Sequence, residues 1–180
     1  ADAGSSIGAA MALTYQLEGH KNKKLTNLYL GNYFSDDEIN EILVKCNIKF
    51  SQKDSIEEST ARLISEGKIV GWFQEKMEGG PRALGARSIL ADPRFVDSRD
   101  KVNKVIKYRE EWRPFTPSMT LGAAEKYFSK FTDAPFMIMT FKANTLAKKE
   151  IPAVVHIDGT SRPQIVNEKS NKRYYNLIKE

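Results

Sequence analysis

Arginine is concentrated in one segment of the chain. Six of the nine arginines lie between residues 81 and 113. The start of this segment, residues 79–88, joins three glycines and a proline to Arg82, Arg87 and Ser88. A guanidinium group offers a planar fork of donors that matches phosphate or carboxylate oxygens. Glycines allow backbone N–H groups to approach the same anion. The residue types therefore predict a cradle for an anion.

Part of the same segment has a simpler interpretation. Basic residues alternate with acidic ones in the set Asp92, Arg94, Asp97, Arg99, Asp100, Lys101 and Lys104. Such alternation is typical of a solvated helix surface with i,i+4 ion pairs. Arg82, Arg87 and Arg113 differ, because they lie beside glycine or proline turns and have few acidic neighbours. These three are the stronger candidates for ligand binding.

Two further polar patches follow along the chain. The first, residues 107–118, contains Lys107, Arg109 and Arg113, and its two prolines predict an extended path that leads to the hydroxyl of Ser118. The second, residues 156–164, follows an apolar segment, and α/β folds often keep their sites where a strand ends. A simple turn at Asp158 is the alternative interpretation of the second patch, and taken alone it is favoured.

Strands and helices that would position these patches alternate along the chain. Strands are expected at residues 28–31, 69–73, 88–91, 136–141 and 154–157. Helices are expected over residues 3–17 and around residues 174–178. Another is expected to begin at the capping box of Ser35 and Glu38, and a further one to run from Asp54 or Ser55 to Gly67. A helix is also expected after Ser98, with Val102, Val105 and Ile106 facing inward. This order favours an α/β fold, with α+β as the alternative. The polar residues 19–24 are the best candidate for a domain boundary.

Composition limits the functional classes. The chain has 180 residues, of which 41% are hydrophobic, and 28 basic against 23 acidic side chains give a net charge of +5. One buried core is expected, and the positive charge suits phosphate ligands or nucleic acid. Cys46 is the single cysteine, so an intrachain disulfide is excluded and a buried role is expected. No apolar run reaches the roughly 20 residues that span a membrane, and no signal peptide is evident, so a cytoplasmic protein is expected.

The three patches, in this order, resemble the C-terminal region of the NodU/CmcH family of O-carbamoyltransferases. The family pattern Met-Glu-x-Gly-Pro-Arg-Ala-Leu-Gly-x-Arg-Ser-Ile-Leu-Ala-Asp-Pro-Arg matches residues 77–94. Asn-x-x-Ile-Lys-x-Arg-Glu-x-x-Arg-Pro-Phe-x-Pro-Ser matches residues 103–118, and His-x-Asp-Gly-Thr-x-Arg-x-Gln matches residues 156–164. Residues 2–10 resemble the end of the family's preceding domain. The resemblance spans nearly the whole chain and is weakest between residues 20 and 68.

The resemblance implies a fold and a division into domains. Residues 1–20 would be the last helix of an N-terminal actin-like carbamoyl-transfer domain with its linker. Residues 21–180 would form a YrdC-like domain that activates carbamoyl phosphate, with a twisted mixed sheet and flanking helices. Family members continue past the position of Glu180, so this domain is expected to be incomplete at its C-terminus, inactive alone and weak in ligand binding.

The resemblance also implies a reaction and its residues. Carbamoyl phosphate and ATP, with Mg²⁺, would give carbamoyl adenylate, which a hydroxyl of a small molecule or glycan then attacks. The residues expected to neutralise the phosphate charges are Arg82, Lys107, Arg113 and Arg162. Substrate or ATP contacts are expected from Arg87, Ser88, Arg109, Ser118 and Gln164. Asp2 would bind a metal ion together with the N-terminal domain, on which the chain would pack.

A different class of function is also compatible with the charge. A basic YrdC-like module could bind nucleic acid or an acidic protein partner. Nucleic-acid binding predicts aromatic residues interleaved with basic ones and an affinity that depends strongly on salt. The arginine-rich segment contains only Phe95, Tyr108 and Trp112 as aromatic residues. Glycines and prolines beside the arginines favour a small anion cradle over a docking surface.

Overall fold

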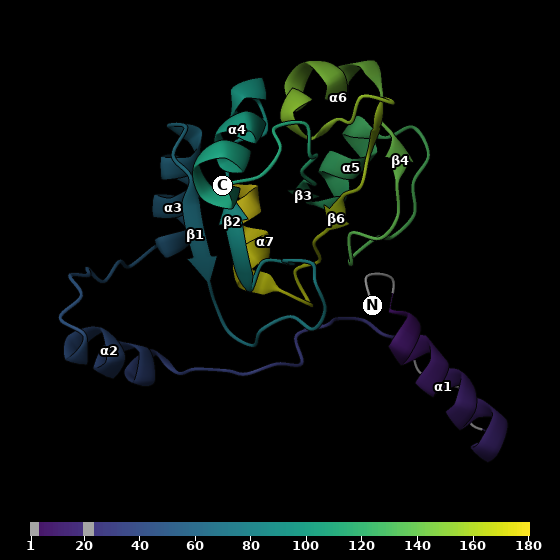
Figure 1. Ribbon diagram of the computed structural model, residues 1–180, viewed down its shortest axis with the longest axis horizontal. Helices are drawn as coiled ribbons and strands as arrows, with labels where there is room; N and C mark the ends of the chain where they lie inside the picture. The colour runs from purple at the N-terminus through teal and green to yellow at the C-terminus, as the bar shows by residue number, and fades with distance from the viewer. Residues whose placement is uncertain (1–3, 20–23) are drawn as a thin grey trace.

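The computed structural model describes residues 4–19 and 24–180. Helices and short strands alternate along the chain (Figure 1). The elements are α1 (Ser5–Glu18), α2 (Asp36–Lys45), α3 (Ile56–Ser65), β1 (Val70–Phe73), β2 (Arg87–Leu90), α4 (Val96–Lys101), the π-helix η1 (Val102–Lys107), β3 (Ser118–Met119), α5 (Leu121–Tyr127), β4 (Phe141–Lys142), α6 (Thr145–Glu150), the 3₁₀-helix η2 (Pro152–Val154), β5 (Thr160–Ser161), β6 (Gln164–Ile165) and α7 (Lys172–Lys179).

A hairpin and two helices form the first packed unit. Strands β1 and β2 pair antiparallel, with Trp72 opposite Ser88. Helices α3 and α7 lie against each other beside the hairpin (Figure 1). Trp72 packs in a buried cluster with Val166 and with Tyr174 and Leu177 from α7. The spacing of Tyr174 and Leu177 places both on one face of α7, which is why this helix covers the cluster.

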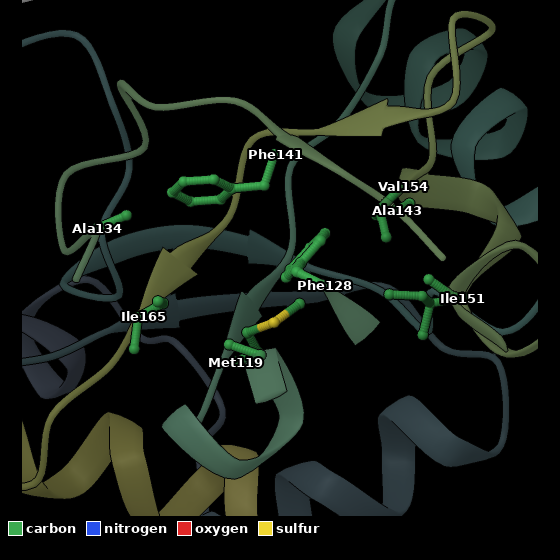
Figure 2. Packing of buried hydrophobic residues seen from close by; sticks show 10 residues of the cluster. Met119, Phe128, Ala134, Phe141, Ala143, Ile151, Val154 and Ile165 are labelled. Atoms are coloured by element: carbon green, nitrogen blue, oxygen red, sulfur yellow. The ribbon is translucent and has the colours of Figure 1, made fainter. Parts of the chain in front are cut away.

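A larger hydrophobic cluster includes buried residues of α5 and α6, and Figure 2 shows how its side chains pack. Its buried members come from strands, helices and connecting loops, and they are Met119, Ala124, Phe128, Ala134, Phe141, Ala143, Ala147, Ile151, Val154 and Ile165. Phe128 and Phe141 meet at a ring-centroid distance of 5.9 Å in a tilted arrangement, which is a favourable geometry for aromatic pairs.

Strand β6 joins the two clusters. It pairs parallel with β3, in a register that places Ser118 opposite Gln164 and Met119 opposite Ile165. Ile165 belongs to the larger cluster, whereas the next residue, Val166, belongs to the cluster beside the hairpin. Alternate side chains of an extended chain point to opposite faces, so this segment serves both clusters. Ser118 and Gln164 therefore lie at the junction of the two clusters.

Two helices lie outside this body. Figure 1 shows α1 and α2 at the edges of the molecule, and none of their residues is buried. The capping box predicted for α2 is confirmed: Ser35 Oγ accepts from Glu38 N, and the Glu38 side chain accepts from Ser35 N. The helix predicted near the N-terminus is confirmed as α1. Of the predicted boundary at residues 19–24, residues 20–23 lie outside the described part. No helix in the described ranges is long and apolar enough to cross a membrane.

The mixed α/β class is confirmed, but the sheet differs from the expected one. Strands of the described residues form three separate two-stranded sheets, β1–β2, β3–β6 and β4–β5. Two pairs are antiparallel and one is parallel. A single twisted mixed sheet is not formed within these residues.

Several local predictions are wrong. No strand forms over residues 154–157, because Pro152 starts the 3₁₀-helix η2 and a turn follows. The strand expected over residues 136–141 is reduced to β4, and residues 28–31 contribute only one β-bridge, from Tyr29 to Glu78. Cys46 is exposed rather than buried, since it directly follows the solvent-facing helix α2 as its C-cap.

The helix predicted after Ser98 also differs. It begins at Val96 and becomes the π-helix η1 after Lys101. Val102 is buried as expected, whereas Val105 and Ile106 are exposed. A π-helix has more residues per turn than an α-helix, so the apolar positions predicted from α-helical spacing no longer share one face.

Candidate functional site

One carboxylate shapes the glycine-rich loop of residues 79–86, called here the Arg82 loop. Glu78 is only 6% exposed, and its Oε1 atom accepts three backbone N–H groups, from Leu84 at 2.6 Å, Ala86 at 3.2 Å and Arg87 at 3.3 Å. Charge-assisted hydrogen bonds of this kind are stronger than neutral ones. Glu78 therefore closes the base of the loop that carries Arg82.

A glycine inside the loop allows a helix to approach it. Gly85 has φ +98°, a conformation that L side chains rarely adopt, and a Cβ atom there would lie 2.2 Å from the ring of Tyr174. Tyr174 is buried, and burial raises the pKa of its hydroxyl to about 12, so the ring presents a neutral phenol. The loop thus packs directly on α7.

Replacement of Gly85 with alanine is expected to destabilise the protein by about 3 kcal/mol, because it adds backbone strain to overpacking. Urea unfolding measures the change. Gly122→Ala is the matched control, since Gly122 lies in α5 with open space around it and should be neutral or slightly stabilised. Equal stability of the two variants would contradict the tight packing of the loop.

The backbone carbonyl of Leu84 accepts hydrogen bonds from two residues that are distant in sequence. It accepts from Tyr29 Oη at 2.8 Å and from Gln164 Nε2 at 2.9 Å. Gln164 Oε1 in turn accepts from Ser118 Oγ at 2.8 Å. We call these four groups, from Tyr29, Leu84, Gln164 and Ser118, the polar junction. It brings together one residue from each of the three patches.

A buried asparagine organises the second patch. Asn103, in the π-helix η1, has no exposed surface. Its Nδ2 donates to the carbonyls of Glu111 at 3.1 Å and Arg113 at 2.9 Å, and its Oδ1 accepts from Arg109 Nε at 2.7 Å. A π-helical turn often marks a functional site. Asn103 therefore fixes the path of the turn that carries the cations of this patch.

Two cations of this patch, Arg109 and Arg113, interact electrostatically. Burial and the neighbouring Arg113 both lower the pKa of Arg109, whose guanidinium also lies 4.7 Å from the ring centroid of Phe115. Arg113 is half-exposed, and its Nη1 lies 3.7 Å from Glu110 Oε2. Lys107 ends η1 and is exposed. The turn thus presents positive charge to solvent.

Two residues of the first patch that were predicted to contact a ligand, Arg87 and Ser88, make hydrogen bonds within the protein. The Arg87 guanidinium donates to the carbonyls of Gln74, Glu75 and Ala86 and lies 3.5 Å from the ring centroid of Phe73. Ser88 is buried, and its Oγ accepts from Gly85 N at 3.0 Å. Both side chains shape the hairpin and the Arg82 loop, and a direct role in binding stays a prediction.

The remaining arginines singled out from the sequence differ in their surroundings. Arg82 is half-buried in its loop, and Arg162 is half-buried between β5 and β6. Asp2 lies outside the described residues. Arg94 and Arg99 form ion pairs with Asp92 and Asp100, as expected of structural residues. These pairs are two and one positions apart and Asp92 is buried, so they are not the i,i+4 pairs of a solvated helix that the alternation predicted.

The third patch forms the simple turn that was its favoured interpretation. Asp158 accepts from both the backbone N and the hydroxyl of Thr160, and these hydrogen bonds lower the pKa of its carboxyl. Gly159 has φ +77°, which suits a turn. Among residues 4–19 and 24–180, no three His, Cys, Asp or Glu side chains gather as metal ligands.

Three residues with positioning roles were not singled out from the sequence. Glu78 and Asn103 belong to the matched patterns, and a glutamate before a glycine-rich loop is a signal that could have been used. Tyr29 lies outside the patterns, and it reaches Leu84 across 55 positions of sequence. Nothing local in the sequence predicts that contact.

Comparison with known proteins agrees with the resemblance found in the sequence. Residues 61–180 match the family described as carbamoyltransferase C-terminus. Nodulation protein NolO of Bradyrhizobium diazoefficiens is 34% identical over 98% of this chain and 34% of its own length. An uncharacterised protein of Methanocaldococcus jannaschii, MJ1058, is 38% identical over 99% of this chain and 30% of its own. Nodulation protein U of Rhizobium tropici is 37% identical over 67% of this chain and 21% of its own.

This chain spans about a third of the length of the first two relatives. The family match covers 120 of the 180 residues and includes the Arg82 loop, the π-helix η1 and both strands of the polar junction. The chain is therefore a member of the carbamoyltransferase C-terminus family.

Proposed function

We propose that this chain is the carbamoyl-phosphate-activating part of an ATP-dependent O-carbamoyltransferase. In the proposed reaction carbamoyl phosphate, ATP and water give carbamoyl adenylate, inorganic phosphate and pyrophosphate. A hydroxyl of a small molecule or glycan then attacks the carbamoyl carbon, the bond to AMP breaks, and AMP and the hydroxyl proton leave. ATP would supply the adenylyl group, with Mg²⁺ bound to its phosphates. Membership of the carbamoyltransferase C-terminus family supports the class of reaction.

The observation that carries the proposal is the polar junction. It joins the Arg82 loop, the start of β3 and the start of β6, which are far apart in sequence. Two substrates with several phosphate groups repel each other unless fixed cations offset their charge. Arg82, Lys107, Arg113 and Arg162 are the proposed cations, with Arg87, Ser88, Arg109, Ser118 and Gln164 as further contacts.

The same proposal covers the domains. Residues 21–180 would belong to a YrdC-like activating domain, and residues 1–20 would belong to the end of an actin-like carbamoyl-transfer domain. That second domain would hold the acceptor and a metal ion, with Asp2 among the ligands. The exposed helix α1, which buries no residue, is consistent with packing on such a domain.

A nucleic-acid ligand is the second candidate, and one observation favours it. Tyr108 is 87% exposed and Trp112 is 75% exposed, and both lie between the cations Lys107 and Arg113. Exposed aromatic side chains among cations are suited to base stacking.

Thermal unfolding with added ligands distinguishes the two candidates. A ligand at 100 times its Kd stabilises a protein by about 2.7 kcal/mol, which corresponds to a rise in Tm of roughly 5–10 °C for a chain of this size. We expect that rise with carbamoyl phosphate and with Mg-ATP, and little change with a single-stranded oligonucleotide. A rise with the oligonucleotide alone, lost at higher salt, would favour nucleic acid instead.

A further inference from the structure

Tyr29 lies before the residues matched by the family and outside the three sequence patterns. Its backbone forms a β-bridge with Glu78, and the neighbouring Leu28 carbonyl accepts from Gly79 N at 2.7 Å. The segment around Tyr29 therefore holds the first residue of the Arg82 loop by backbone hydrogen bonds.

The side chain of Tyr29 holds the other end of the same loop. Its hydroxyl donates to the Leu84 carbonyl at 2.8 Å, where Gln164 Nε2 also donates. Leu84 is 2% exposed, so its carbonyl depends on these protein donors. One residue thus connects both ends of the loop that carries Arg82.

Asn171, the N-cap of α7, fixes the orientation of the Tyr29 hydroxyl. Asn171 Nδ2 donates to Tyr29 Oη at 2.9 Å, so the hydroxyl proton remains available for Leu84. Asn171 Oδ1 accepts from Tyr174 N at 3.0 Å, as the cap of α7, and from Gln74 Nε2 at 2.9 Å. Burial is the main cause that raises the pKa of Tyr29, which keeps the hydroxyl protonated as a donor.

We propose that Tyr29 is a positioning residue that holds the Arg82 loop in its binding shape, through the hydroxyl that joins Asn171 to the Leu84 carbonyl. The consequence for ligand binding rests on the proposed function. Tyr29 would not touch the ligand, and its effect would pass through the loop and Arg82.

The variant Tyr29→Phe removes one hydroxyl and keeps the ring. Tyr33→Phe is the matched control, because Tyr33 lies close in sequence and its side chain is exposed. Hydrogen exchange reports the loop directly, since the amides of Gly79, Leu84 and Ala86 are hydrogen-bonded there. We expect exchange at Leu84 and Ala86 to become at least about 10-fold faster in Tyr29→Phe and to stay unchanged in Tyr33→Phe.

Affinity for carbamoyl phosphate is measured on the same variants and on Arg82→Ala. We expect Tyr29→Phe to weaken binding about 10-fold, in line with the loss of one buried hydrogen bond. In the Arg82→Ala background, Tyr29→Phe should cause no further loss of affinity, because the effects of coupled residues on the binding free energy do not add. A merely structural role would give the same loss in both backgrounds.

Each outcome decides one claim. Unchanged exchange in Tyr29→Phe overturns the positioning role, whatever the affinity. Faster exchange with unchanged affinity shows that the loop does not serve this ligand. If the unchanged chain itself binds no carbamoyl phosphate, the proposed function fails, and the exchange result still decides the role of Tyr29. Asn171→Ser, which keeps an oxygen for capping α7 and loses the donor to Tyr29, should reproduce the faster exchange if Tyr29→Phe folds poorly.

Discussion

Replacement of Arg82 with alanine is expected to lower the affinity for carbamoyl phosphate about 100-fold, or ~2.7 kcal/mol. A hydrogen bond to a charged group contributes about 1.5–3 kcal/mol, and a guanidinium can make two parallel bonds to one phosphate. Arg82 lies in a loop fixed by Glu78, Leu84 and Gly85, so the position of its backbone should survive the change. Isothermal calorimetry on the purified chain measures the affinity.

Two controls separate the role of Arg82 from general charge. Arg82→Lys keeps the charge and loses the planar fork, so an intermediate loss of affinity is expected. Arg173→Ala removes a half-exposed arginine of α7 whose guanidinium pairs with Glu57 of α3, and it should leave the affinity unchanged. Equal losses for Arg82→Ala and Arg173→Ala would contradict a specific role for Arg82.

Replacement of Asn103 with alanine is expected to destabilise the protein by about 3 kcal/mol, because it removes a buried hydrogen-bonding side chain. The change leaves the carbonyls of Glu111 and Arg113 and the Nε of Arg109 without this partner. Each unsatisfied buried polar group costs about 1–3 kcal/mol, and partial access of water to the turn reduces the sum. The turn with Lys107 and Arg113 should also lose its fixed path, so the affinity for carbamoyl phosphate should fall as well.

Urea unfolding and calorimetry on the same sample check both effects. Asn40→Ala is the matched control, because Asn40 lies exposed on α2 and its replacement should change stability by less than about 0.5 kcal/mol. A value that small for Asn103→Ala would contradict the role assigned to this side chain.

Local patterns predicted the elements that local chemistry determines. The capping box of α2, the hairpin strands around Trp72 and Ser88, and the C-terminal helix with Tyr174 were all expected. Each depends on side chains a few residues apart. The strand expected at residues 154–157 failed, because a short apolar run cannot be told from a buried turn by periodicity alone. Val154 is buried in the larger cluster from a 3₁₀-helix instead.

The sequence named two residues of the polar junction, Ser118 and Gln164, as ligand contacts. Ser118 Oγ donates to Gln164 Oε1 at 2.8 Å, and the ligand role of both residues stays a prediction. The residues that hold the loops were missed, because their partners are backbone groups distant in sequence, as with Tyr29 and Leu84. Residue type suggested a ligand role for Arg87, yet its guanidinium is engaged by backbone carbonyls. Composition cannot distinguish an arginine that binds a ligand from one that stabilises a turn.

Recognition of carbamoyl phosphate by this chain is the property on which the proposed function depends. Calorimetric titration of the unmodified chain with carbamoyl phosphate, acetyl phosphate and inorganic phosphate tests it most directly, because the three ligands share a phosphate and differ in the attached group. Saturable 1:1 binding of carbamoyl phosphate, at least about 10-fold tighter than binding of the other two, is the expected result. Equal affinity for all three, or no binding of any, would contradict the proposed activation of carbamoyl phosphate.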